Sequence, residues 1–279
     1  MRRTRPAKRR QPVVVCSIGS VDPTGGAGLF LDAAIYARIG GVSPVYAVAG
    51  ITAQNSRDVA LVEPVRPRML VAQLDALRAQ TSIDAIRIGL IPSASASGAV
   101  ARWLRHQRRS SRRPPVVLDP VIAASSGKRL VRPGTVRAMG ALLRACDVAT
   151  PNAAEAAELA GIAVDNVDDA CHAASLLSKR YGCAVLVTGG HLRGGTRVTD
   201  VLARDGRIER FASTRQRADA RGTGCMLAAA LAVALARGDD LSPAIRSARR
   251  FVRAALVGSR PLGRGRRQFD AAGVGRSAV

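Results

Sequence analysis

The stretch ADARGTGCMLAAALAVALARG, residues 218–238, joins a glycine-bearing turn to a long apolar run. The run is rich in Ala and Leu, both strong helix formers, and a charged segment closes it. Its length of about fourteen residues falls short of the roughly twenty that a membrane-spanning helix needs. The stretch therefore predicts a helix buried in the core of a globular domain.

The turn Gly222-Thr223-Gly224-Cys225 stands at the predicted N-terminus of this helix. The first amide groups of a helix have no partner within it, and the helix dipole favours negative charge there. Glycines also let the backbone approach a bound group closely. The turn therefore predicts either an anion-binding site or, as the simpler alternative, a glycine turn that caps a core helix.

Strand-like and helix-like segments alternate along the rest of the chain. Strands are expected over residues 13–19, 42–55, 83–91, 116–122, 147–152 and 183–191, with a hairpin over 198–213. Helices are expected over residues 29–40, 67–80, 97–107, 134–146, 153–161, 167–182 and 242–257. This alternation predicts an α/β fold with a mostly parallel central sheet and helices on both faces. Ligands of such folds bind at the carboxyl ends of the strands.

The length of 279 residues suits one large domain with a substantial core, and the chain shows no internal repeat. We expect a basic, disordered N-terminal arm over residues 1–11 and a single domain over residues 12–260. A loose Gly/Arg-rich tail is expected over residues 261–279.

Five scattered cysteines form no C-x-x-C pair, so neither a metal site nor a redox motif is indicated by their spacing. The apolar part of the first strand is too short for a signal peptide. The protein is therefore expected in the cytoplasm, with reduced thiols and no membrane segment.

The formal net charge of +23 is concentrated in three basic regions, residues 2–10, 102–115 and 246–267. This charge indicates either a surface that binds a polyanion or a solvated, arginine-rich periphery. The aromatic content of only 3% makes stacking on nucleic-acid bases unfavourable, and no nucleic-acid-binding motif accompanies the charge. Binding to nucleic acid, if present, is expected to be non-specific and salt-dependent.

Two carboxylates follow predicted strands and should meet at one edge of the sheet. Asp119 ends the strand VVLDPV, and Glu155 follows the short strand before TPNAAEAAEL. Together they could hold Mg²⁺ through water, although each also fits a structural role, as a polar strand end or a first-turn helix acid.

The segment SSGKRL lacks the leading glycine and closing hydroxyl of a P-loop, and no G-x-G-x-x-G follows a strand. A nucleotide would therefore have to bind without either motif.

A set of motifs, in order along the chain, resembles the hydroxymethylpyrimidine and phosphomethylpyrimidine kinases of thiamine biosynthesis, within the ribokinase superfamily. The motifs are DPTGGAGLFLD (22–32), ITAQNS (51–56), IRIGL (86–90), VLDPVIAASSGKRL (117–130), ATPNAAEA (149–156), VLVTGGH (185–191) and RGTGC (221–225). The similarity runs from about Val13 to about Gly265. It implies a ribokinase-like three-layer sandwich, a kinase that uses ATP and Mg²⁺, and a homodimer.

The resemblance also implies a role for individual residues. The positions that match the family's pyrimidine-binding residues are Asp32, Gln54, Ala27, Val121 and Leu90. The positions that match its nucleotide and phosphate contacts are Asn152, Thr188, Gly189, Gly190 and Arg221, with Asp119 and Glu155 at the metal. Gly222, Thr223 and Gly224 would form the anion hole, and Cys225 stands at the position of the catalytic base.

Cys225 suits a base because a helix N-terminus lowers the pKa of a thiol, whereas the simpler alternative is a small buried residue that packs the turn. The chain departs from the family pattern at Ala34, Arg221 and Met226, which leaves the substrate open. Three functions therefore remain: a hydroxymethylpyrimidine or hydroxymethylpyrimidine-phosphate kinase, a kinase of pyridoxal-like or modified pyrimidine alcohols, and a catalytically weak relative that binds a polyanion.

Overall fold

The structure is a computed structural model that describes residues 11–108, 113–192, 195–216, 220–263 and 265–273. The predicted basic arm lies outside these residues except for Gln11, as do the last residues of the predicted tail. The described strands are β1 (Val13–Val21), β2 (Val42–Gln54), β3 (Val59–Pro64), β4 (Ala85–Ile88), β5 (Val116–Leu118), β6 (Val148–Ala149), β7 (Ala184–Val187), β8 (Arg197–Arg204), β9 (Arg207–Thr214), β10 (Arg260–Pro261) and β11 (Arg267–Gln268).

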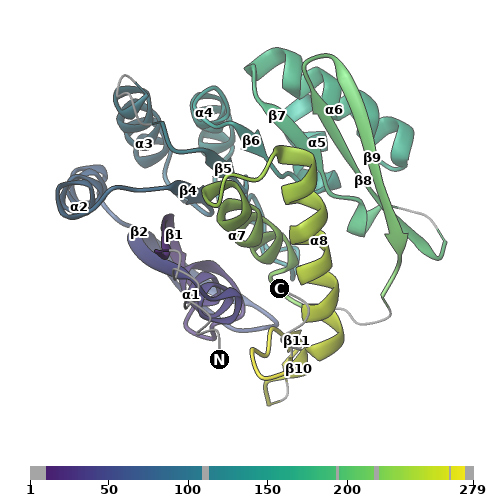
Figure 1. Ribbon diagram of the computed structural model, residues 1–279, viewed down its shortest axis with the longest axis horizontal. Helices are drawn as coiled ribbons and strands as arrows, with labels where there is room; N and C mark the ends of the chain where they lie inside the picture. The colour runs from purple at the N-terminus through teal and green to yellow at the C-terminus, as the bar shows by residue number, and fades with distance from the viewer. Residues whose placement is uncertain (1–10, 109–112, 193–194, 217–219, 264, 274–279) are drawn as a thin grey trace, which may run out of the picture.

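Nine of these strands form one sheet in the order β3-β2-β1-β4-β5-β6-β7-β8-β9 (Figure 1). The pairs from β2 through β1, β4, β5 and β6 to β7 are parallel, whereas β3, β8 and β9 pair antiparallel at the two ends. The predicted mostly parallel sheet is therefore confirmed. Strand β3 was missed because its alternating Val and Leu residues are few and follow a polar corner.

Helices cover both faces of the sheet, as predicted. They are α1 (Gly28–Ile39), α2 (Pro67–Gln80), α3 (Ala94–Gln107), α4 (Pro133–Leu143), α5 (Ala153–Ala160), α6 (Val167–Tyr181), α7 (Thr223–Ala236) and α8 (Leu241–Gly258), with a 3₁₀ turn, η1, at Gly189–His191. One buried cluster joins the sheet to α2, α3, α4, α5 and α6, and the other joins it to α1, α7 and α8. Figure 1 shows these layers on either side of the strands.

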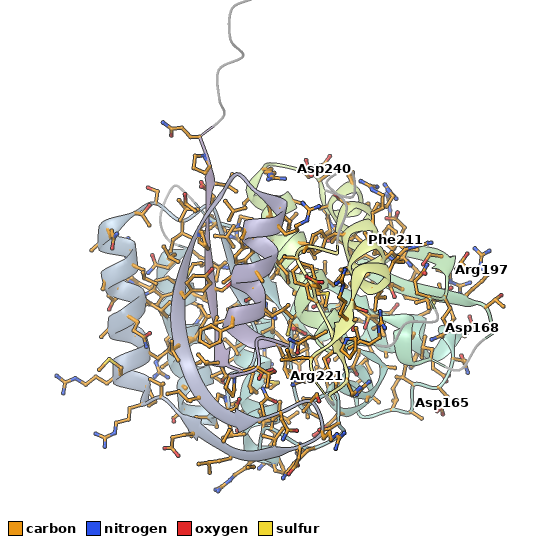
Figure 2. The ribbon with its side chains drawn as sticks, turned by 90° about the horizontal axis from the view of Figure 1, so that it is seen from below. Asp165, Asp168, Arg197, Phe211, Arg221 and Asp240 are labelled. Atoms are coloured by element: carbon orange, nitrogen blue, oxygen red, sulfur yellow. The ribbon has the colours of Figure 1, made fainter. Side chains whose placement is uncertain are left out.

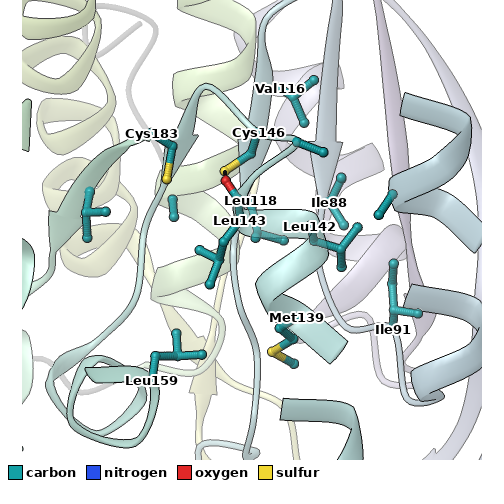
Figure 3. Packing of buried hydrophobic residues seen from close by; sticks show 14 of the residues in the cluster. Ile88, Ile91, Val116, Leu118, Met139, Leu142, Leu143, Cys146, Leu159 and Cys183 are labelled. Carbon is teal, nitrogen blue, oxygen red and sulfur yellow. Dashed lines mark hydrogen bonds between the residues drawn. The ribbon is translucent and has the colours of Figure 1, made fainter. Parts of the chain in front are cut away.

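Both cores are built from aliphatic side chains of short strands and of the helices above them. In Figure 3, Ile88 of β4 and Leu118 of β5 pack near Leu142 and Leu143 of α4. Each such side chain stabilises the fold by about 1.5–3 kcal/mol on burial. This packing fixes the strand ends, and therefore the loops that follow them.

The apolar helix that opened the sequence analysis is α7, and every residue from Met226 to Ala234 is buried. It is apolar on all sides because α1, α8 and the sheet contact it. The predicted core helix is confirmed. In the part of the chain that the structure describes, no helix has the length and apolar character needed to cross a bilayer.

Part of the predicted C-terminal tail is built into the fold. β10 and β11 pair antiparallel, and the carbonyl of Arg267 accepts a hydrogen bond of 2.9 Å from the amide of Arg221. The side-chain amide of Gln268 donates a hydrogen bond of 3.3 Å to the backbone carbonyl of Thr24. The composition of this segment suggested a loose tail, but its backbone bonds attach it to the turn before α7.

Candidate active site

The turn before α7 has a shape that only glycine adopts easily. Gly222 has a φ of 76°, and a Cβ at this position would overlap the carbonyl oxygen of Gly26 and the side chain of Leu31. No side chain caps the helix, and Thr223, Gly224 and Cys225 are partly exposed while the next residues are buried. The first turn of α7 therefore presents backbone amides toward a region open to solvent.

Arg221 joins this turn to the glycine-rich loop between β1 and α1 (Figure 2). Its Nη2 forms a buried ion pair of 3.1 Å with Asp22, and its Nη1 donates to Thr24 Oγ1 at 3.1 Å. Thr24 in turn donates from its amide and hydroxyl to Asp22, both at 2.9 Å. The guanidinium group thus links the turn before α7 to the glycine-rich loop before α1. Its predicted contact with phosphate remains a prediction.

A buried arginine lies behind the turn, between two of the predicted site residues. Arg87 of β4 has no exposed surface; its Nη2 donates to Asp119 Oδ2 at 2.9 Å, and its Nη1 lies 3.4 Å from Asp32 Oδ2. Gly89 leaves room for the guanidinium, since a Cβ there would overlap it. Arg87 therefore holds the substrate-side and metal-side carboxylates in one charge cluster.

Asp32 lies on the face of α1 that contacts the sheet, and it too has no exposed surface. Burial raises its pKa from 3.8 to about 6, while the positive charge of Arg87 opposes that rise. In this conformation Asp32 faces Arg87 rather than open space. Its predicted contact with a pyrimidine therefore requires a movement and stays a prediction.

The other predicted substrate residues gather at neighbouring strand ends. Gln54 ends β2, Ala27 follows β1, Leu90 follows β4, and Val121 follows β5, and these strands are adjacent and parallel. Leu90 is nearly buried, and the other three are partly exposed. The carbonyl of Leu90 accepts a 3.0 Å hydrogen bond from Ser20 of β1, which ties two of these strand ends together. The sheet thus brings these residues to the same edge as the α7 turn.

Asp119 and Glu155 are buried, and the charge of Asp119 affects the protonation of Glu155. Glu155 forms a capping box with Asn152, and its two oxygens accept the amides of Asn152 at 2.9 Å and Ile122 at 3.3 Å. Burial, with the charge of Asp119, raises the pKa of Glu155 from 4.5 to about 8. Burial also raises the pKa of Asp119, although Arg87 opposes this.

This pair of carboxylates supplies hard oxygen donors whose mutual repulsion a divalent cation would relieve, which fits Mg²⁺ held jointly with phosphate oxygens. Among the described residues, no three His, Cys, Asp or Glu side chains come close enough to form a metal site by themselves. A site here would therefore need oxygens from the substrate or from water.

Cys225 lies in the first turn of α7, near the buried charge cluster. Burial raises the pKa of its thiol from 9.0 to about 12; Arg87 lowers it, and Asp119 and Asp32 raise it. The net shift is therefore opposite to the lowered pKa that the helix N-terminus alone predicts. Burial and the two carboxylates outweigh the favourable helix end.

The predicted nucleotide turn, Thr188-Gly189-Gly190, follows β7 and lies beside the start of α5. The amide of Thr188 donates to the carbonyl of Pro151 at 2.9 Å, and Thr188 forms a bridge with Asn152. The amide of Gly189 donates to Asp200 Oδ1 at 2.7 Å. That amide is therefore already used, whereas Thr188 is partly exposed and Gly190 exposed.

A hollow of about 350 Å³ adjoins this turn. Its lining residues come from η1, from the start of α6 and from the ends of β8 and β9: Val167, Gly189, Leu192, Gly195, Thr196, Arg197, Thr199 and Arg215. It lies at the same edge of the sheet as the α7 turn, because β7 ends there and β8 begins there.

The chain is similar to known proteins over most of its length. Residues 22–270 match the family model described as phosphomethylpyrimidine kinase. The chain belongs to the phosphomethylpyrimidine kinase family. It is 37% identical to the hydroxymethylpyrimidine/phosphomethylpyrimidine kinase of Rhizobium meliloti, with 87% of this chain and 90% of that protein covered. It is 35% identical to the thiamine biosynthesis bifunctional protein ThiED of Geobacter sulfurreducens, but spans only 50% of its length, against 90% of this chain.

Solved structures of kinases share the fold. The phosphomethylpyrimidine kinase of Clostridium difficile aligns with a TM-score of 0.76 at 26% identity, over 88% of this chain and 99% of that one. The pyridoxal kinase of Bacillus subtilis, solved with ADP, aligns with a TM-score of 0.84 at 27% identity, over 94% and 98%. The predicted ribokinase-like three-layer sandwich is therefore confirmed.

Within the family fold, two charged residues of the site were not selected from the sequence. Arg87 interrupts the apolar strand AIRI, and Asp200 interrupts the apolar strand VTDVLA. Each is a lone charged residue within an apolar strand. This pattern was the available signal, because a charged side chain is rarely buried unless it has a partner. Met226, a departure from the family pattern, is fully buried and faces the core.

Proposed function

We propose that the protein transfers the terminal phosphoryl group of ATP, with Mg²⁺, to 4-amino-5-hydroxymethyl-2-methylpyrimidine, its monophosphate, or both. The observation that carries the proposal is the uncapped first turn of α7, which lies against Asp119 at the carboxyl edge of the sheet. A Cβ built on Gly224 would lie 3.6 Å from Asp119 Oδ1. Fixed amides and a nearby metal carboxylate are what phosphoryl transfer requires, because charge collects on the phosphate oxygens.

The pyrimidine binds, in this proposal, among the strand ends that carry Gln54, Ala27, Val121 and Leu90. Gln54 offers an amide that can both donate to and accept from an aminopyrimidine edge. The three apolar residues would contact the ring and its methyl group. Asp32 would act on the pyrimidine only after a side-chain movement, because it is fully buried here.

The nucleotide binds on the other side of the α7 turn. Thr188, Gly190 and Asn152 would line its phosphates, and the hollow beside Gly189 would take the ribose and base. The amides of Gly222, Thr223 and Gly224 would face the migrating phosphoryl group. Solved relatives of the same fold bind nucleotides, including the Bacillus subtilis kinase with ADP.

Asp119 and Glu155 would hold Mg²⁺ with the help of phosphate oxygens. The ion supplies charge neutralisation on the phosphates. Arg87 keeps Asp119 in place through the 2.9 Å hydrogen bond from its Nη2. The raised pKa of Glu155 means that ion binding competes with a proton at this carboxyl group.

Cys225 would accept the proton of the substrate hydroxyl. In a loose phosphoryl-transfer transition state this proton leaves late, so the base need not be ionised early in the step. The positive charge of Arg87 already favours the thiolate, and a cation beside Asp119 would favour it further. The base role therefore depends on the occupied site.

A related kinase of pyridoxal-like alcohols is the second candidate. It is favoured by the higher TM-score with the Bacillus subtilis pyridoxal kinase, 0.84 against 0.76 for the Clostridium difficile enzyme. The amide of Gln54 at the predicted pyrimidine position favours the aminopyrimidine instead.

The deciding experiment is a coupled ADP-release assay with hydroxymethylpyrimidine, its monophosphate and pyridoxal, each with and without Mg²⁺. The proposal predicts Mg²⁺-dependent turnover with at least one of the two pyrimidines, and a kcat/KM at least about tenfold below it for pyridoxal. Turnover confined to pyridoxal would establish the second candidate. No ADP release with any of the three acceptors would refute both.

We further propose a cytoplasmic homodimer. All five cysteines are free thiols, which fits a reducing compartment.

The proposed dimer is supported by apolar residues on one face of the β2–β3 pair, where β3 is an edge strand. The exposed residues on this face are Ile51, Ala53 and Leu61. Light scattering on the purified protein would test this, and a monomer at micromolar concentration would refute the dimer.

A further inference from the structure

Asp200 of β8 is a buried carboxylate directly behind the predicted nucleotide turn. Its Oδ1 accepts the amide of Gly189 at 2.7 Å, and its Oδ2 accepts Nε of Arg249 at 2.7 Å. The side chains of Asp200 and Arg249 are 10% and 13% exposed, so water screens this pair poorly. Both oxygens of the carboxylate are thus occupied, one by the turn and the other by helix α8.

Arg249 is itself held in place on two further sides. Its Nη2 donates to Ser213 Oγ of β9 at 3.1 Å, and its guanidinium lies 5.9 Å from the centre of the Phe211 ring. The pair therefore links the turn after β7 to β8, β9 and α8. A planar, fixed guanidinium is better suited to this than a mobile lysine.

Gly189 packs closely against the backbone of β8. A Cβ at Gly189 would overlap the carbonyl of Thr199, so the turn lies directly on the backbone of β8. The bond to Asp200 turns the Gly189 amide inward, while exposed Gly190 and half-buried Thr188 remain at the surface of the turn. Gly189 also lines the hollow of about 350 Å³.

We propose that Asp200 and Arg249 are positioning residues that set the shape and local charge of the nucleotide turn, and so the affinity for nucleotide. The inference rests on the proposed function, in which this turn lines the phosphates of ATP. The carboxylate orients the turn through Gly189. The guanidinium cancels a negative charge that would otherwise stand one hydrogen bond behind a site for an anion.

The orienting role of the Asp200 carboxylate and the neutralising role of the Arg249 guanidinium predict different results for variants of the pair. Asp200→Ala loses the acceptor for Gly189, whereas Asp200→Asn keeps a carbonyl that can accept it. Arg249→Met leaves the acceptor but exposes the nucleotide to an unpaired carboxylate. Combining Arg249→Met with Asp200→Asn removes that carboxylate, so the double variant should bind nucleotide better than Arg249→Met alone. A purely structural role predicts the opposite order, because the double variant has lost more contacts.

The experiment is calorimetric titration of each folded variant with ADP and Mg²⁺, together with KM for ATP and for the alcohol substrate. Arg246→Met is the matched control, since Arg246 also lies on α8 and over Phe211, at 5.7 Å, but pairs with Glu209 at the surface. We expect ADP affinity to fall at least about tenfold in Asp200→Ala and Arg249→Met. We expect it to recover at least about threefold in the double variant, and to change by less than about twofold in Arg246→Met.

KM for the alcohol should stay within about twofold of wild type in every variant, because the pair contacts only the nucleotide side. Equal ADP affinities in wild type and Arg249→Met would overturn the inference, as would a double variant no better than Arg249→Met. Arg249→Met and the double variant keep an acceptor for Gly189, so the test stands even where Asp200→Ala fails to fold. A wild-type protein that binds no ADP would instead refute the proposed function.

Discussion

Replacing Arg87 by Met tests the buried charge cluster. The variant keeps a long apolar side chain but leaves Asp32 and Asp119 without the cation between them. Removing one partner of a buried ion pair costs about 3–5 kcal/mol, because the remaining charge stays out of water. We therefore expect Arg87→Met to lower the free energy of unfolding by about that amount at pH 7.

The loss should shrink at lower pH. The pKa of Asp32 is already about 6 with Arg87 in place, because burial outweighs the guanidinium. Without Arg87 the pKa of each carboxyl group would rise further, so Asp32 would be neutral near pH 5 and less negative charge would lack a cation than at pH 7. For acids whose folded pKa is raised, stability is greatest below the unfolded pKa and falls as the pH rises through the folded one.

Urea unfolding at pH 5 and pH 7 would measure both effects, with Arg87→Lys as the conservative variant. Arg210→Met is the control, since the Arg210–Asp168 pair is exposed and its loss should leave the free energy of unfolding nearly unchanged. Arg87→Lys should recover part of the stability. A loss below about 1 kcal/mol in Arg87→Met at pH 7, or the same loss at both pH values, would refute the reasoning.

Three further predictions concern the turn, the base and the metal-side carboxyl. Gly222→Ala should lower the unfolding free energy by more than about 1 kcal/mol and abolish ADP release, because its Cβ would overlap Gly26; wild-type turnover would contradict this. Cys225→Ala should keep the wild-type melting temperature and lose at least about 100-fold in kcat, with Cys171→Ala unchanged; a rate near wild type would remove Cys225 from the mechanism. The pKa of Glu155 is about 8 in the fold against 4.5 ordinarily, so the folded protein binds the extra proton and stability should fall as pH rises between these values. Chemical unfolding of Glu155→Gln without Mg²⁺ should show a flatter pH dependence, and an unchanged profile would show that another group titrates.

The layers of the fold could be predicted because they depend on local patterns. The alternation of strands and helices specifies a parallel sheet, and the uniformly apolar α7 has to be buried whatever its neighbours are. The turn at Gly222 could be located for the same reason, since a glycine pair before a core helix leaves amides unpaired. The carboxyl ends of parallel strands then place Asp119 and Glu155 at the same edge.

What could not be predicted depends on contacts between distant segments. A lone charge in an apolar strand marks Arg87 as unusual, but only the fold shows that it lies between Asp32 and Asp119. The pKa of Cys225 depends on those same carboxylates and on burial, neither of which the turn sequence contains. Gln268 binds Thr24 although its neighbours suggest a loose tail, because backbone and amide bonds rather than apolar burial hold it.

The role of the Gly189 amide also depends on a contact with another segment of the chain. Its place in the TGGH motif suggests an amide that faces phosphate, but Asp200 occupies that amide. The residue that occupies this amide, Asp200, lies in the next strand, 11 residues further along the chain. The motif thus locates the turn, but only the packing shows which backbone amides of the turn are already hydrogen-bonded within the protein.

A crystal structure with a non-hydrolysable ATP analogue, Mg²⁺ and hydroxymethylpyrimidine would test the central claim most directly. It should place the terminal phosphate within hydrogen-bond distance of the first amides of α7, with the cation between that phosphate and Asp119. A terminal phosphate bound elsewhere, or an α7 turn filled by protein side chains in the complex, would contradict phosphoryl transfer at this helix.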